Sequence, residues 1–473
     1  MVFSSPTFLF LFLPVVFALH ALVPRRFRNA LLLLASLIFY GWGEPVFVLV
    51  MILSALVNFL LAIGIDRKFS LNRTPRLFMA LVVIFNIGLL AVLKYADFII
   101  SAISSLLGIT IPLLGIPLPI GISFFTFQAM SYCIDVYRRQ TPVQRNYGDL
   151  LLYISFFPQL IAGPIVRYHD VAEQIRQRTI SADKMSSGLL RFTIGLAKKV
   201  LIANYVGQIA DAIFSLAAPD LTMAVSWLGA AAYFLQIYFD FSGYSDMAIG
   251  LGRIFGFEFK ENFLYPYAAT SLKEFWQRWH VSLSTWFKEY LYVPLGGNRC
   301  GQLRTALNKV IVFFLTGLWH GASWTFVIWG LIHGVFLLLE DYGVIPVKKL
   351  WQPIRHFYTL LIVLLAFVLF RAESFSQATA MLRAMFTDFA AITAGSPAAL
   401  LLADRLTPAT LVILPLSLLL AMPILPALRR KTAAFENRLS LNLFRYVSAA
   451  VVFALCLFSL STSAYNPFIY FRF

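Results

Sequence analysis

Charged residues are scarce in this sequence, and acidic residues are the scarcest. Only 13% of the 473 residues are charged and 60% are hydrophobic, with 38 Lys and Arg against 22 Asp and Glu. A soluble domain carries about 25% charged residues, so the composition excludes that class and predicts a multi-pass membrane protein. The basic excess does not indicate nucleic-acid binding, because these residues lie in short loops between apolar runs, the pattern that sets membrane orientation.

Cysteines and cofactor motifs are also few. The three cysteines, Cys133, Cys300 and Cys456, form neither a disulfide framework nor a metal-binding spacing. No P-loop, zinc signature or Gly-x-Ser-x-Gly elbow appears, and the Gly-Leu-Gly of residues 250–252 lacks the third glycine of a dinucleotide motif. We therefore expect no metal and no bound cofactor.

The loops alternate between basic and non-basic along the chain. The first apolar run has no positively charged start and no cleavage site, so we expect it to be retained in the membrane. Arg25, Arg26 and Arg28 follow it at once and are placed in the cytoplasm by the positive-inside rule, whereas residues 96–119 contain no Lys or Arg and face out. The alternation predicts that the N-terminus and the C-terminal tail, residues 464–473, both lie outside.

The apolar runs predict an all-α fold with roughly eleven transmembrane helices, counted against about 20 residues per span. Residues 150–166 contain Pro158, Gly163 and Pro164, which indicates a broken or re-entrant element. Residues 271–292 have apolar side chains at helical spacing and predict an interfacial amphipathic helix. We expect further helices at about 187–216 and 223–239. No repeat or flexible linker interrupts the chain, which favours a single domain over 1–473.

One apolar run stops at a histidine. Residues 310–318 lead to a Trp-His-Gly tripeptide at 319–321. At about 1.5 Å per residue His320 lies about 17 Å along this segment, near the middle of a hydrocarbon core of about 30 Å. A titratable group at that depth usually lines a pathway, and desolvation keeps an imidazole neutral and able to act as a general base. His333, in the returning segment, is a second candidate, whereas we expect His20, His169 and His356 to be packed or interfacial.

Several longer motifs closely resemble the membrane-bound O-acyltransferase family. Residues 275–284, 290–299 and 319–321 carry the family resemblance. Residues 156–164 and 239–246 look like its bacterial branch, which acetylates polysaccharides such as alginate. The similarity runs over most of the chain.

This resemblance implies a funnel-shaped helical membrane fold with a central channel and a catalytic core at about 120–345. The invariant histidine of the family corresponds to His320, and the second polar catalytic position to His280. We expect His320 to take the proton from the acceptor hydroxyl, with His280 polarising the carbonyl or positioning the donor. Acetyl-CoA is then a co-substrate, and the partners are a periplasmic acetyltransferase, an exported polysaccharide and the lipid of the bacterial inner membrane.

Basic side chains on the cytoplasmic face are candidates for attracting the phosphates of coenzyme A. They are Lys273, Arg278, Lys288 and Arg299, together with Asn298. Ordinary positive-inside residues would produce the same pattern.

Tyr470 lies in an aromatic terminus, residues 468–473, a few residues beyond the last apolar run. Similar terminal tyrosine motifs occur in proteins partnered with this family, where the hydroxyl is thought to carry the acyl group. We therefore expect Tyr470 to act as an acyl carrier or, alternatively, as an interfacial aromatic anchor.

Two other functions stay open. The first is transfer of another acyl group, such as D-alanine moved from a carrier protein to teichoic acid. A transporter or polysaccharide-export subunit is the other, because Asp240 and Asp246 are acids in a largely apolar stretch and such acids can mark ion or proton pathways.

Overall fold

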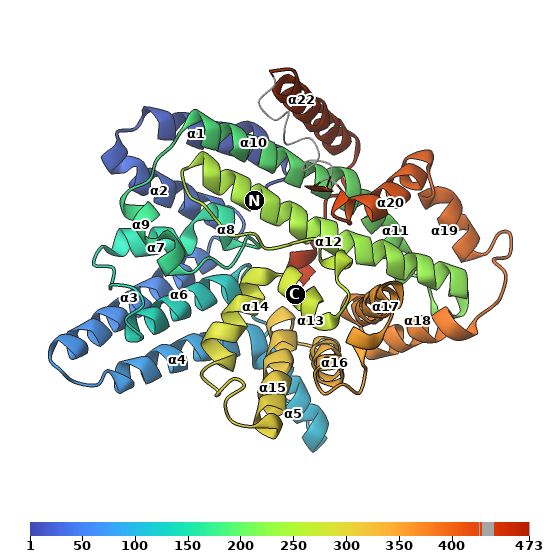
Figure 1. The fold of residues 1–473 in the computed structure, drawn as a ribbon, viewed down its shortest axis with the longest axis horizontal. Helices are drawn as coiled ribbons and strands as arrows, with labels where there is room; N and C mark the ends of the chain where they lie inside the picture. The colour runs from blue at the N-terminus through green and yellow to red at the C-terminus, as the bar shows by residue number, and fades with distance from the viewer. Residues whose placement is uncertain (425, 428–438, 473) are drawn as a thin grey trace. The chain divides into compact units, whose positions relative to one another are not determined.

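The protein is built from helices. The computed structural model describes residues 1–424, 426, 427 and 439–472, and no strand occurs among them. The prediction of an all-α protein is therefore confirmed. The chain divides into two compact units, and Figure 1 labels the helices of both. Unit 1 comprises Met1–Phe192 with Met247–Lys260, and unit 2 comprises Thr193–Asp246 with the chain from Glu261 onward.

Unit 1 contains the N-terminal helices. They are α1 (Leu13–Leu22, after a π-turn at Phe8–Phe12), α2 (Arg28–Gly41), α3 (Phe47–Ser70), α4 (Arg76–Leu90), α5 (Ala96–Leu107), α6 (Ile122–Tyr137), α7 (Tyr147–Ser155), α8 (Phe157–Leu160), α9 (Tyr168–Arg176) and most of α10 (Ala182–Ala197). The break between α7 and α8 agrees with the element expected at 150–166, because Pro158 begins a new helix there.

Aromatic rings and one amide pair hold unit 1 together. Phe157 packs against Phe12 and Phe39 at ring distances of 5.3 and 5.6 Å. Asn58 on α3 and Asn86 on α4 exchange side-chain hydrogen bonds of 2.8 and 3.2 Å in a buried position. Such amide pairs stabilise helix contacts where no water is available.

Unit 2 contains the remaining helices. They are α11 (Asn204–Phe214, after a π-helical turn at Lys198–Ala203), α12 (Met223–Ile254, whose last turns belong to unit 1), α13 (Leu272–Arg278), α14 (Val281–Phe287), α15 (Gln302–His320), α16 (Trp324–Asp341), α17 (Gln352–Arg371), α18 (Phe375–Thr387), α19 (Pro397–Arg405), α20 (Pro408–Leu420) and α22 (Leu439–Thr462). The chain ends in a short 3₁₀ turn, Ile469–Arg472.

Two helix boundaries differ from the sequence prediction. Helix α12 continues to Ile254 instead of ending near Phe239, because its glycines serve close packing: a Cβ at Gly243 would crowd the backbone of Gly195. The expected single helix at 271–292 is broken at His280, whose backbone is left-handed with φ of 44°. A left-handed residue cannot continue a right-handed helix, so the chain turns there.

Helices α15 and α16 form a hairpin in which the backbones touch. A Cβ at Gly330 would overlap the carbonyl oxygen of Phe313 and lie 3.1 Å from the Cα of Gly317. A Cβ at Gly317 would in turn overlap the carbonyl oxygen of Phe326. Glycine is therefore required at both positions, as in the close helix pairs typical of membrane proteins.

Within the described residues, five helices are long and apolar enough to cross a membrane. They are Phe47–Ser70, Arg76–Leu107, Trp324–Asp341, Gln352–Arg371 and Asn442–Thr462. The pair α19 and α20, bent by 81°, makes a sixth if it is one broken span. Several other apolar segments are short or interrupted, as α1, α7 and α8 are. The protein is thus a multi-pass membrane protein, and the expected count of eleven stays a prediction.

The hairpin contact leads to a test of stability. We expect Gly330→Ala to lower the free energy of unfolding by about 1–3 kcal/mol, the usual effect of overpacking, because the new methyl group meets backbone that cannot move aside. Thermal unfolding of the detergent-purified protein measures the change. Gly88→Ala is the matched control, since a Cβ at this helical glycine of α4 meets nothing within 4 Å. Equal melting temperatures for the two variants would contradict the packing argument.

Candidate active site

Three predicted site residues surround one indole ring in unit 2. Trp319 contacts the rings of His320, His280 and Tyr470 at centroid distances of 4.9, 5.8 and 6.2 Å. They come from the end of α15, the turn between α13 and α14, and the C-terminal segment. Both histidines and Trp319 are buried, and Tyr470 is half-buried. The tertiary structure therefore brings together the two proposed catalytic histidines and the proposed carrier.

His320 lies in an aromatic enclosure. It ends α15, as the sequence predicted, and its ring meets Trp329 of α16 at 5.0 Å and Phe370 of α17 at 5.3 Å, both edge-on. His333 lies one ring further away, 5.1 Å from Trp329, and is fully buried. This enclosure excludes water from the imidazole, which strengthens its electrostatic interactions with any bound reactant.

His280 is held at a tight turn by Asn262. The carbonyl of Asn262 accepts the Val281 N–H at 2.9 Å, and its side chain accepts the N–H and hydroxyl of Ser282 at 3.0 and 2.9 Å. The left-handed backbone of His280 directs the chain from α13 into α14. Burial lowers the pKa of His280 to about 3, so the imidazole is neutral near pH 7 and one ring nitrogen can accept a hydrogen bond.

A first cavity, of about 300 Å³, opens beside the middle of α15, along Lys309 to Thr316. Lys273, Lys288 and Asn298 line it, so it gathers three of the five residues predicted to bind the donor. Its apolar walls include Trp276 and Phe313. Thr316 also lines it and lies four residues before His320, which is about one helical turn. The cavity thus runs from a basic rim toward the candidate active site.

The other two predicted donor-binding residues lie elsewhere. Arg278 forms an ion pair of 2.8 Å with Glu274 and donates to the carbonyl of Leu264 at 3.1 Å. Arg278 and Arg299 are not among the described residues that line the first cavity. Sequence reasoning instead missed Lys309, which lines the cavity and pairs with Asp341. A lysine directly before the apolar run at 310–318 was the available signal.

A second cavity, of about 440 Å³, adjoins the start of α16. Its lining residues include Ser323, Thr325 and Phe326 near the hairpin turn, Asp211 and Arg371, and Pro467 and Ile469 of the C-terminal segment. Thr325 in this cavity and Asp341 in the first cavity are sixteen residues apart on α16, or about 24 Å along the helix axis. The two cavities therefore lie toward opposite ends of the hairpin that carries His320.

The aspartates considered for a transport pathway are both paired with lysines. Asp240 lies 2.7 Å from Lys199, and Asp246 lies 2.7 Å from Lys198. Sequence reasoning missed these lysines, although two consecutive lysines in an apolar helical run are an unusual and informative signal in a membrane protein.

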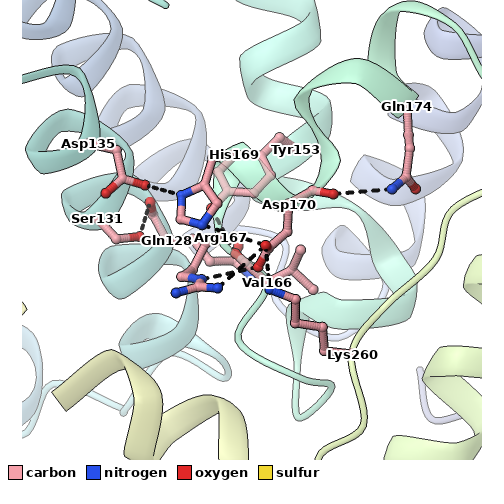
Figure 2. Close-up of polar contacts among 10 residues, drawn as sticks. All are labelled: Gln128, Ser131, Asp135, Tyr153, Val166, Arg167, His169, Asp170, Gln174 and Lys260. Carbon is pink, nitrogen blue, oxygen red and sulfur yellow. Dashed lines mark hydrogen bonds and ion pairs between the residues drawn. The ribbon is translucent and has the colours of Figure 1, made fainter. Parts of the chain in front are cut away.

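Unit 1 has a polar cluster of its own, drawn in Figure 2. The Nδ1 of His169 lies 2.8 Å from the buried carboxylate of Asp135 on α6. Asp170 forms ion pairs with Arg167 at 3.1 Å and Lys260 at 2.6 Å. Burial alone would raise the pKa of Asp170, but the hydrogen bonds from Lys260 and Arg167 lower it below its usual range. These contacts tie α6, α9 and the segment after α12 together, so His169 has a structural environment, as expected.

Comparison with known proteins gives consistent matches. The sequence model of the membrane-bound O-acyltransferase family matches residues 77–345. A protein named "probable alginate O-acetylase" from Azotobacter vinelandii is 39% identical over the whole of both chains. The peptidoglycan O-acetyltransferase of Helicobacter pylori is 35% identical, covering 81% of this chain and 80% of its own. The teichoic acid D-alanyltransferase of Bacillus subtilis is 29% identical over 52% of this chain and 65% of its own.

The strained turn at His280 leads to a prediction that separates conformation from chemistry. Asparagine adopts the left-handed backbone more readily than other residues with a side chain, whereas β-branched valine of similar size does not. We therefore expect His280→Val to be about 1–2 kcal/mol less stable than His280→Asn. Thermal unfolding of both variants measures the difference. The pair His356→Val and His356→Asn, within α17, is the control. If valine and asparagine were equally stable at 280, the left-handed turn would not be a requirement.

Proposed function

Since the chain belongs to the membrane-bound O-acyltransferase family and is therefore an O-acyltransferase, we propose that it moves acetyl from cytoplasmic acetyl-CoA across the bacterial inner membrane. The final acceptor is an exported polysaccharide, reached through a periplasmic acetyltransferase partner. The observation that carries this proposal is the meeting of His320, His280 and Tyr470 around Trp319, between two cavities of unit 2.

The choice of acetyl and polysaccharide rests on the relatives. The relative from Azotobacter vinelandii is named for acetylating alginate and that from Helicobacter pylori for acetylating peptidoglycan, and each is similar over four fifths of this chain or more. The D-alanyltransferase is similar over only about half of the chain. These coverages favour acetyl over D-alanyl and a saccharide polymer as acceptor, and D-alanyl transfer to a cell-envelope polymer is the second candidate.

We propose a single membrane domain with roughly eleven crossings and a funnel-shaped channel, whose catalytic core lies at about 120–345. Both termini lie outside, on the periplasmic side. In this orientation the first cavity, with its basic rim, opens to the cytoplasm, and the second cavity opens to the periplasm. The broken segment formed by α7 and α8 is a re-entrant element shielded by protein.

In the first cavity, Lys273 and Lys288 attract the phosphates of coenzyme A by charge, and Asn298 offers its side chain beside them. The apolar wall formed by Trp276 and Phe313 packs against the arm of coenzyme A that carries the thioester. Acetyl-CoA is consumed as a co-substrate, so no resident cofactor and no metal takes part in the proposed reaction.

The chemistry requires a base and little else, because a thioester is already activated. His320 takes the proton of the attacking hydroxyl, the new ester C–O bond forms, and the C–S bond breaks. The proton then passes to the leaving thiolate, which departs as coenzyme A. His280, whose ring centroid lies 5.8 Å from that of Trp319, orients the donor or polarises its carbonyl.

Tyr470 is the first acceptor in this proposal. Its ring stands edge-on to Trp319 at 6.2 Å, which supports a role beyond that of an interfacial anchor. The phenol accepts acetyl, and the resulting aryl ester is handed to the periplasmic partner, which selects the polymer.

The transporter alternative is less well supported. Asp240 and Asp246 each face a lysine at 2.7 Å, so their charges are balanced within unit 2. A transporter would move its substrate across the membrane of vesicles without acyl transfer. Acetyl labelling of the protein distinguishes the two functions.

Acetyl labelling tests the catalytic assignment. We expect purified protein incubated with acetyl-labelled acetyl-CoA to retain label on the C-terminal peptide. His320→Ala should lower the rate by about 10²–10⁴-fold, the usual contribution of a general base. Tyr470→Phe keeps the ring and should carry no label on that peptide.

His356→Ala is the matched histidine control and should label at the wild-type rate. A folded His320→Ala protein that still transferred acetyl at the wild-type rate would refute the role of His320 as general base. Unchanged polymer acetylation by Tyr470→Phe, with the partner present, would exclude the carrier.

The donor cavity leads to a prediction about affinity. Lys273→Gln and Lys288→Gln should each raise the KM for acetyl-CoA by about 1.4- to 5-fold, from the ~0.2–1 kcal/mol of an exposed ion pair, and salt should reduce this increase. Steady-state release of coenzyme A measures it. Arg299→Gln is the control, because Arg299 is exposed and is not among the described residues that line the cavity. If all three variants had the same KM, the basic residues would serve only membrane orientation.

A further inference from the structure

The C-terminal segment, residues 465–470, folds back into unit 2, and Figure 1 draws the chain end among the helices of that unit. Polar groups of unit 2 bind four of the five consecutive residues 465–469. Asp211 accepts the Tyr465 hydroxyl at 2.6 Å, and Asn204 donates to the Asn466 side chain at 3.3 Å. Lys199 donates to the carbonyl of Pro467, and Asp240 accepts the N–H of Ile469 at 3.0 Å.

The remaining residue, Phe468, is held by a ring contact. Its ring stacks on Tyr244 of α12 at 4.7 Å. Tyr470 follows immediately and stands edge-on to Phe241 at 5.6 Å and to Trp319 at 6.2 Å. Only one peptide bond separates the backbone atom bound by Asp240 from the residue proposed to carry acetyl. The position of Ile469 therefore limits where Tyr470 can reach.

Lys199 and Asp240 form an ion pair with each other as well as with the segment. Their charged atoms are 2.7 Å apart, and their side chains are only 5% and 1% exposed. Burying two charges is costly, and a buried pair is tolerable only when further hydrogen bonds satisfy both groups. Here those further partners are a backbone carbonyl and a backbone N–H of the C-terminal segment, Pro467 and Ile469.

Backbone partners have a specific consequence. Because the lysine and the aspartate bind main-chain atoms two residues apart, they set how far the segment enters the protein, whatever the intervening side chain. The neighbouring pair, Lys198 and Asp246, has the same chemistry and the same 2.7 Å separation but is more exposed, at 25% and 8%. Lys198 donates to Asp246.

We propose that the Lys199–Asp240 ion pair is a clamp that holds the C-terminal segment at the depth where Tyr470 meets Trp319. Lys199 and Asp240 are positioning residues for acyl loading. The role in loading rests on the proposed function of Tyr470, whereas the clamp itself is a property of the fold. Ordering a chain terminus costs conformational entropy, and the buried pair offsets this cost only while the segment is docked.

The test first measures docking without using the reaction. Ile469 is 4% exposed, so Ile469→Cys reports docking by its rate of maleimide labelling. Cys300→Ser removes the exposed cysteine of the chain, and Cys133 and Cys456 are buried. Ala464→Cys, at an exposed position directly before the segment, gives the rate for full access.

The clamp variant is the double substitution Lys199→Met with Asp240→Leu. Both charges are removed together because a single buried charge without its partner would destabilise the fold. The matched control is Lys198→Met with Asp246→Leu, which removes the neighbouring pair. Size-exclusion profiles and melting temperatures of both doubles establish that they are folded.

We expect the clamp variant to label at Ile469→Cys at least tenfold faster than the parent, and the control to label at the parent rate. On the chain with native Ile469, the clamp variant should lose at least tenfold in acetyl label on the C-terminal peptide. Its KM for acetyl-CoA should be unchanged, since the donor cavity contains neither residue of the pair. General misfolding would instead change both values.

Three outcomes decide the matter separately. Unchanged maleimide access in a folded clamp variant overturns the clamp, whatever the acetyl label shows. Increased access with undiminished Tyr470 labelling overturns the positioning role. Increased access together with no acetyl label on the parent chain supports the clamp and refutes the proposed function.

Discussion

The contact between the backbones of α15 and α16 is the constraint on which the candidate active site depends. Gly317 and Gly330 bring the two helices closer than any side chain would allow. This approach places Trp329, beside Gly330, against His320, three residues beyond Gly317. A larger residue at either glycine would separate the helices and with them the two walls of the histidine enclosure. The same hairpin carries the first cavity near one end and the second cavity near the other.

Around this hairpin, unit 2 gathers its reactive groups on apolar and aromatic surfaces. The ring of Trp319 contacts His280, His320 and Tyr470, which are far apart from one another in the chain. The faces and carbon edges of these aromatic rings exclude water that would hydrolyse a thioester or an aryl ester. The neutral state of His280 follows from the same burial. The enclosure of these rings and the neutral state of His280 are therefore two results of one packing arrangement.

Charge is arranged by a different device. A π-helical turn at Lys198–Ala203 presents two consecutive lysines to α12, where they meet Asp246 and Asp240. π-Helical turns are rare and occur often at functional sites, because they shift side chains out of the regular helical register. The Lys198–Asp246 pair joins the turn to α12, and the Lys199–Asp240 pair also binds the backbone of the C-terminal segment. The segment is thereby part of the fold rather than a free end.

The sequence by itself determined the membrane class, the all-α fold, the break at 150–166 and the end of α15 at His320, because composition, proline and run length act locally. It also singled out His280, His320 and Tyr470 through their motifs. Only the tertiary structure decided that these three meet at Trp319, that Arg278 turns to Glu274 instead of the donor cavity, and that α12 continues past its glycines. It also supplied Lys199 as the partner of Asp240. Each of these depends on contacts between residues distant in the chain, and local periodicity carries no information about which distant surfaces will pack together.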